Sequence, residues 1–150
     1  MIRTMFAALA LSASPALSAQ TSDLTYVNPI GGNWRYAAET GGTQASFVGA
    51  TGTVQLTIRC ARANRAVTIS KPASAPVTSI SVWTTAMTRT LAGTYDAAGA
   101  KVTATLAATD PLLDAIVFSR GRFGVTVPGS PPLVLPPWAE PARVVEDCRS

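Results

Sequence analysis

The chain has 150 residues, enough for one domain, with a formal net charge of +4 at pH 7 and no histidine. Without histidine, Ser-His-Asp and Cys-His catalytic sites are excluded and the commonest metal ligand is missing, so we expect no cofactor and no bound metal. The basic residues are scattered rather than clustered, which argues against binding to nucleic acid.

Residues 1–19 have the pattern of a secretory signal peptide. Arg3 supplies a short positive region, residues 5–11 are apolar, and small residues precede cleavage after either Ser18 or Ala19. The apolar run is far shorter than the roughly 20 residues of a membrane-spanning helix, and no later stretch replaces it. We therefore expect a periplasmic or secreted protein with no membrane span in the mature chain.

Residues 20–32 are polar and rich in turn-forming residues, which predicts a flexible N-terminal arm before a single β-rich domain at residues 33–150. In the domain, alternating apolar and polar residues recur at a spacing of about ten residues, as is typical of a sandwich or barrel. The predicted strands lie in segments 33–36, 44–48, 54–61, 66–70, 77–85, 87–91, 101–107, 123–127 and 133–135.

The clearest strand is residues 54–61, where alternation places Val54 on the same inward face as Leu56, Ile58 and Cys60. Taken together, the segments predict seven to nine strands. The fold class that follows is mainly β, an antiparallel β-sandwich or barrel-like domain with one short internal helix and a C-terminal helix.

Two helices interrupt the strand pattern. The first begins at Asp110, a favourable N-cap, followed by proline at the first helical position. Its expected apolar face consists of Leu112, Leu113, Ile116 and Phe118. The second covers residues 138–148, where Val144, Val145 and Cys148 form a narrow inward stripe.

Cys60 and Cys148 are the only cysteines, and export would place them in an oxidising compartment. An even pair in that setting predicts a disulfide, which would join the second helix to the strand of residues 54–61. Two buried free thiols are the alternative. Two distant cysteines without histidine do not make a zinc site.

Arg120 and Arg122 are the candidate binding residues. Their spacing gives them the same strand parity, so both would project from one face and could grip a carboxylate or phosphate. The alternative, which we favour, is that they form structural ion pairs with Asp110, Asp114 or Glu146.

No catalytic residue is predicted. Asp110 and Asp114 lie four residues apart, as paired catalytic carboxylates on a helix would, but a helix cap and a surface ion pair explain them better. Trp34, Trp83 and Trp138 are interpreted as packing residues, because a sugar-stacking surface would need two of them exposed together.

Three blocks carry a resemblance to known proteins: LTIRC at residues 56–60, DPLLDAIVFSRGRFGV from residue 110, and LPPWAEPARVVEDCR ending at Arg149. They resemble small exported proteins of unknown function from sphingomonad-type alphaproteobacteria. The L-x-I-x-C strand and the late cysteine are also similar to the TagO/VasI-type accessory proteins of type VI secretion. Neither resemblance implies a catalytic residue.

The function expected from the sequence is that of a non-enzymatic periplasmic or secreted binding or accessory domain, with an envelope protein or glycan as partner. The alternative is a small secreted inhibitor of a hydrolase such as a lysozyme or protease. An inhibitor would present a rigid protruding loop, and residues 71–76, with two prolines, are the candidate.

Overall fold

The structure is a computed structural model that describes residues 23–150. It contains two antiparallel sheets, one internal helix and one C-terminal helix, which confirms the predicted mainly β sandwich. The predicted signal peptide, residues 1–19, lies outside the described residues. Within them, no helix is long and apolar enough to cross a membrane.

The part of the chain that the structure describes has more strands than the seven to nine expected, and it has both predicted helices. The elements are β1 (Gly32–Glu39), β2 (Gly42–Gly49), β3 (Val54–Ala61), β4 (Ala66–Pro72), β5 (Ser79–Trp83), β6 (Thr88–Ala92), β7 (Thr94–Asp96), β8 (Lys101–Ala107), α1 (Pro111–Val117), β9 (Phe123–Thr126), β10 (Leu133–Leu135) and α2 (Ala139–Arg149). The unexpected strand is β7, a three-residue segment that pairs with β8 at the sheet edge.

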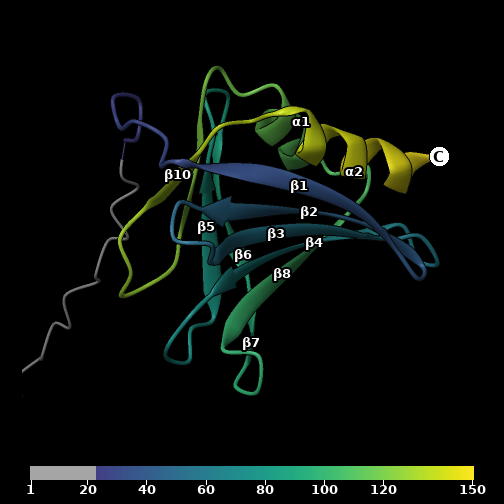
Figure 1. Cartoon of the computed structure of the whole chain (residues 1–150), viewed down its shortest axis with the longest axis horizontal. Helices are drawn as coiled ribbons and strands as arrows, with labels where there is room; N and C mark the ends of the chain where they lie inside the picture. The colour runs from purple at the N-terminus through teal and green to yellow at the C-terminus, as the bar shows by residue number, and fades with distance from the viewer. Residues whose placement is uncertain (1–22) are drawn as a thin grey trace, which may run out of the picture.

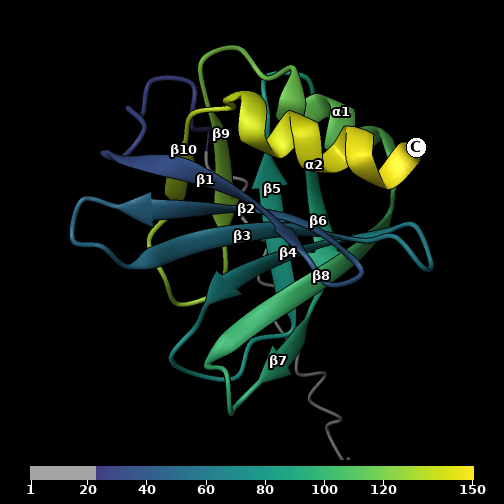
Figure 2. The same ribbon diagram turned by 45° about the vertical axis from the view of Figure 1, so that its right-hand side comes forward.

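The larger sheet has the strand order β1-β2-β3-β4-β8-β7, and the smaller sheet has the order β10-β9-β5-β6. In Figure 1, β5 and β6 stand upright behind β1–β4, which run across the view, so the two sheets cross. The turned view in Figure 2 shows α2 lying along the large sheet beside α1. This arrangement covers one end of the large sheet with helices.

The core lies between the sheets and is formed by inward side chains of both. Trp34 of β1 meets Phe47 of β2 edge-on, with ring centroids 5.4 Å apart, and stacks on Phe123 of β9 at 6.4 Å. The Trp34 indole Nε1 donates to the carbonyl oxygen of Pro136 at 2.8 Å. This aromatic cluster therefore joins the two sheets and satisfies the one polar atom that it buries.

Helix α2 packs against the large sheet through the stripe that its sequence predicted, because Val144, Val145 and Cys148 are buried. The predicted disulfide is confirmed: Cys148 is bonded to Cys60 of β3, with the two Cα atoms 5.4 Å apart across 88 residues of chain. Both cysteines are fully buried, so the cross-link is part of the core.

Helix α1 begins as expected, with the Asp110 side chain accepting the backbone N–H of Leu112 at 2.9 Å. Leu112, Leu113 and Ile116 are buried. The placement of Phe118 on this apolar face was wrong, because the helix ends at Val117 and Phe118 is 77% exposed. Helix α1 is therefore one residue too short to place Phe118 on its buried face.

Strand β3 contains a bulge that the alternating pattern did not reveal. Phe47 pairs with Leu56, but the next residue of β2, Val48, pairs with Val54, so Gln55 is an extra residue in β3. The expected inward position of Val54 was therefore wrong, and its side chain is 44% exposed.

Of the predicted arm, residues 23–32 are described; Gly32 already belongs to β1, and residues 23–31 run over the small sheet. Leu24 is buried, and a Cβ atom added at Gly124 of β9 would lie 2.0 Å from its Cδ1. Further along, the Ile30 backbone N–H donates to the carbonyl oxygen of Val134 at 2.9 Å. The glycine leaves the space that Leu24 occupies, and the hydrogen bond brings Ile30 to the edge of the sandwich.

Candidate functional site

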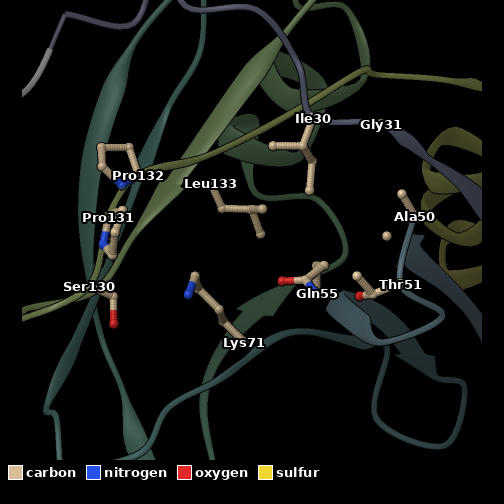
Figure 3. Close-up of a pocket in the computed structure, with 11 residues that line it drawn as sticks. Ile30, Gly31, Ala50, Thr51, Gln55, Lys71, Ser130, Pro131, Pro132 and Leu133 are labelled. Carbon is tan, nitrogen blue, oxygen red and sulfur yellow. The ribbon is translucent and has the colours of Figure 1, made fainter.

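An open cleft of about 460 Å³ lies where the two sheets separate, at the end of β3 opposite to Cys60. It is lined by Ile30, Gly31, Gly49, Ala50, Thr51, Gln55, Lys71, Ser130, Pro131, Pro132 and Leu133. Figure 3 shows Ile30 and Leu133 approaching this space from one side and Gln55 and Lys71 from the other. The cleft thus combines an apolar wall with a polar one.

Lys71 reaches the cleft because it belongs to a strand. The expectation that residues 71–76 form a protruding loop was wrong at its first positions, since β4 continues through Pro72. Lys71 pairs with the buried Val102 of β8, two residues beyond the buried Ile69 on the same face of β4. The strand therefore directs a lysine toward the space between the sheets.

The electrostatics of the cleft come from this one side chain. Among the described residues that line it, Lys71 is the only titratable one. The ion pairs of the described residues join Arg59 to Glu39, Arg89 to Asp110 and Arg149 to Asp114, and none involves Lys71. Burial lowers the pKa of the Lys71 ammonium group, because the charged form loses hydration.

Gln55 faces the cleft as a result of the bulge in β3. Along a regular strand it would share a face with Thr57 and Arg59, on the outer side of the large sheet. The extra residue at the bulge reverses this order, so Gln55 lines the cleft while Val54 lines a neighbouring hollow of about 200 Å³. Its amide can both donate and accept hydrogen bonds beside Lys71.

This cleft was not predicted from the sequence. The signal that could have found it is the run Val67, Ile69, Lys71, in which the lysine continues the inward parity of two core residues. The bulge at Gln55 had no comparable signal, because a bulge changes the register of a strand without changing its composition.

Arg120 and Arg122 are not neighbours on one strand face, because both precede β9 in a bend around Gly121, whose φ is +73°. The Arg120 backbone N–H donates to Thr85 Oγ1 at 3.0 Å. The Arg122 Nη1 group donates to the carbonyl oxygen of Val27 at 2.8 Å. Arg122 thus holds the N-terminal segment rather than a carboxylate.

The ion pairs that we favoured for these arginines were wrong. Asp110 pairs with Arg89 at 2.7 Å, and Asp114 pairs with Arg149 at 2.8 Å. Within residues 23–150, neither Arg120 nor Arg122 forms an ion pair. Each of the two aspartates therefore has its own arginine partner.

The acidic end of α2 is engaged with β1. The Tyr36 hydroxyl donates to Asp147 Oδ2 at 2.7 Å, and this hydrogen bond raises the pKa of Tyr36. The guanidinium carbon of Arg143 lies 4.0 Å from the centroid of the Tyr36 ring. These contacts fasten α2 to β1 of the large sheet.

The tryptophans have different environments: Trp34 is buried, Trp83 is half-buried and Trp138 is 45% exposed.

In the described part of the chain, no group of three or more Asp, Glu or Cys side chains could hold a metal ion. The chain matches no family model, no curated protein and no solved structure.

Proposed function

We propose that this is a non-enzymatic binding domain that acts outside the cytoplasm and holds a small molecule in the cleft beside Lys71. The observation that carries the proposal is the cleft itself. Its volume of about 460 Å³ falls within the range of small-molecule sites, and it has the usual composition of an apolar lining with a few polar groups.

Two features support a place outside the cytoplasm. The buried disulfide between Cys60 and Cys148 is of a kind that persists mainly in oxidising compartments. Residues 1–19 also have the composition of a secretory signal peptide. Periplasmic or secreted localisation follows as a proposal from these two features together.

The chemistry of the described acids supports a binding role over catalysis. Asp110 caps a helix and pairs with Arg89, Asp114 pairs with Arg149, and Asp147 accepts from Tyr36. None of these three carboxylates lines the cleft. A small molecule is favoured over a glycan because none of the described residues that line the cleft is aromatic and could stack on a sugar ring.

The alternative function is that of a hydrolase inhibitor, but part of the loop expected for it belongs to a strand. Residues 71 and 72 belong to β4, and Ala73 is buried with its backbone N–H donating to the carbonyl oxygen of Ala100 at 2.9 Å. A protruding reactive loop would have to be formed by the few residues that follow. Assays against lysozymes and proteases test this alternative directly.

The binding proposal is tested with the fluorescent probe 1-anilinonaphthalene-8-sulfonate, which combines an apolar ring system with one anionic group. We expect saturable binding with a stoichiometry of one in the purified protein. Thr51→Trp should fill the cleft and remove binding. Thr53→Trp is the matched control, because Thr53 shares a hydroxyl hydrogen bond with Thr51 but does not line the cleft. Equal binding by both variants, or none by the parent protein, would refute the proposal.

A further inference from the structure

The chemical class of the ligand can be inferred from the position of Lys71. Its side chain leaves β4 on the face that carries Val67 and Ile69, both fully buried. The neighbouring position across the sheet, Val102 of β8, is fully buried as well. A lysine at this position brings an ammonium group to the rim of an apolar core, where its charge is poorly hydrated.

Within residues 23–150, no acidic group forms an ion pair with Lys71. The lining of the cleft includes neither aspartate nor glutamate, and the three ion pairs of the described residues lie elsewhere. A half-buried charge without a partner costs stability, and an anion that enters the cleft would relieve that cost. The position therefore has the electrostatic complementarity that an anionic group needs.

A second polar group lies next to the lysine. The bulge in β3 turns Gln55 into the cleft, and Figure 3 shows its side chain on the same side of the space as Lys71. The amide N–H groups of Gln55 can donate to an anion that contacts the Lys71 ammonium. One charged and one neutral donor on the same wall suit a carboxylate or phosphate oxygen.

The opposite wall is apolar. Ile30 is 39% exposed and lines the cleft together with Leu133. Pro131 and Pro132 extend this wall and offer no N–H group. A ligand that contacts both walls therefore needs an apolar body as well as a charged end.

Resting on the proposed function, we infer that the cleft binds a small amphiphilic anion. Its carboxylate or phosphate head contacts Lys71 Nζ and the Gln55 amide, and its short hydrocarbon tail lies against Ile30, Leu133 and the two prolines. The volume of about 460 Å³ and the open mouth limit the enclosed part of the tail to a short chain.

Four probes with eight-carbon chains test this inference: octanoate, octyl phosphate, octanol and octylammonium. Binding is followed through the backbone amide resonances of Gly31, Gln55 and Leu133 in the purified protein. We expect octanoate or octyl phosphate to bind at least about tenfold more tightly than octanol, with octylammonium weakest. Acetate and inorganic phosphate, which lack the tail, should bind much more weakly than their octyl counterparts.

Variants of the two lysines supply the matched comparison. Lys71→Met should weaken octanoate binding about tenfold or more and leave octanol binding unchanged, whereas Lys71→Arg should retain the preference for anions. Lys101→Met is the control, because Lys101 lines the neighbouring hollow, which Lys71 also lines, and is not among the described residues that line the cleft. In the parent protein, the pKa of Lys71, followed through its ¹³Cε resonance, should rise when octanoate binds, so the test does not depend on folding of a variant.

The outcomes separate the inference from the function on which it rests. If octanol binds as tightly as octanoate, or if Lys71→Met and Lys101→Met behave alike, the cleft remains a binding site and the anionic class is wrong. If acetate matches octanoate, the tail contacts are wrong. If none of the probes shifts the cleft resonances, both the inference and the proposed function are overturned.

Discussion

The guanidinium of Arg89 donates to Oδ2 of Asp110 at 2.7 Å, while Oδ1 of the same carboxylate accepts the backbone N–H of Leu112 at 2.9 Å. One side chain therefore joins β6 of the small sheet to the first turn of α1. The carboxylate is mostly buried, with 19% of its side chain exposed. The sequence alone gave no indication of this link between β6 and α1.

Replacing Asp110 should destabilise the protein through both contacts. Asp110→Ala removes a helix N-cap and leaves Arg89 without its partner, so we expect the free energy of unfolding to fall by about 1–2 kcal/mol. Asp110→Asn keeps a capping oxygen and should lose less. Urea denaturation measures both. Asp114→Asn is the control, because its ion pair is more exposed and should change stability by well under 1 kcal/mol.

The same carboxylate predicts an acid dependence of stability. The hydrogen bond from Arg89 lowers the pKa of Asp110 from its ordinary value of 3.8. Because the folded pKa lies below the unfolded one, this contribution is fully present above the unfolded value and is lost as the pH falls through the folded pKa. The stability difference between the parent protein and Arg89→Met should therefore be constant near neutral pH and shrink in acid. A difference that grows below pH 3.8 would contradict this assignment.

The disulfide should contribute to stability without being needed for the fold. Purified protein from an oxidising compartment should have no thiol that reacts under denaturing, non-reducing conditions, and mass spectrometry should show the cross-link of Cys60 to Cys148. The double variant Cys60→Ala with Cys148→Ala should lose about 2–4 kcal/mol of unfolding free energy and keep its β-rich circular dichroism spectrum. Two freely alkylated thiols in the native protein would refute the prediction.

Replacing Arg120 and Arg122 together by alanine should change stability little. Neither forms an ion pair in the described chain, and Arg122 makes one hydrogen bond to a backbone carbonyl, so the expected loss is about 1 kcal/mol or less. The thermal midpoint measures it. A loss of about 3 kcal/mol or more would indicate that these arginines form structural ion pairs, as we expected from the sequence. Arg122→Ala alone should account for most of the change.

Much of the fold could be predicted because its determinants are local. Alternation in residues 54–61 defines β3, the Asp110 cap and proline define the start of α1, and the spacing of Val144, Val145 and Cys148 defines the buried face of α2. Two cysteines allow only one intramolecular disulfide. These features need no knowledge of which segments meet in space.

The missed features depend on tertiary contacts. The two aspartate–arginine ion pairs join residues that lie 21 and 35 positions apart in the sequence. Residue type alone does not show which of several arginines pairs with each aspartate. The inward turn of Gln55 follows from a register shift against β2. Lys71 was assigned to a loop because Pro72 follows it, yet proline is compatible with the last position of a strand.

The position of the two cysteines along the chain sets the order in which the structure can be completed. Cys60 lies in β3, whereas every described strand precedes Cys148. Because a chain is synthesised and delivered from its N-terminus, all of these strands can pair before the second sulfur arrives. The disulfide therefore cross-links strands that can already have paired, and strand pairing does not depend on its formation. Once closed, the bond lies out of reach of external reductants unless α2 first lifts away.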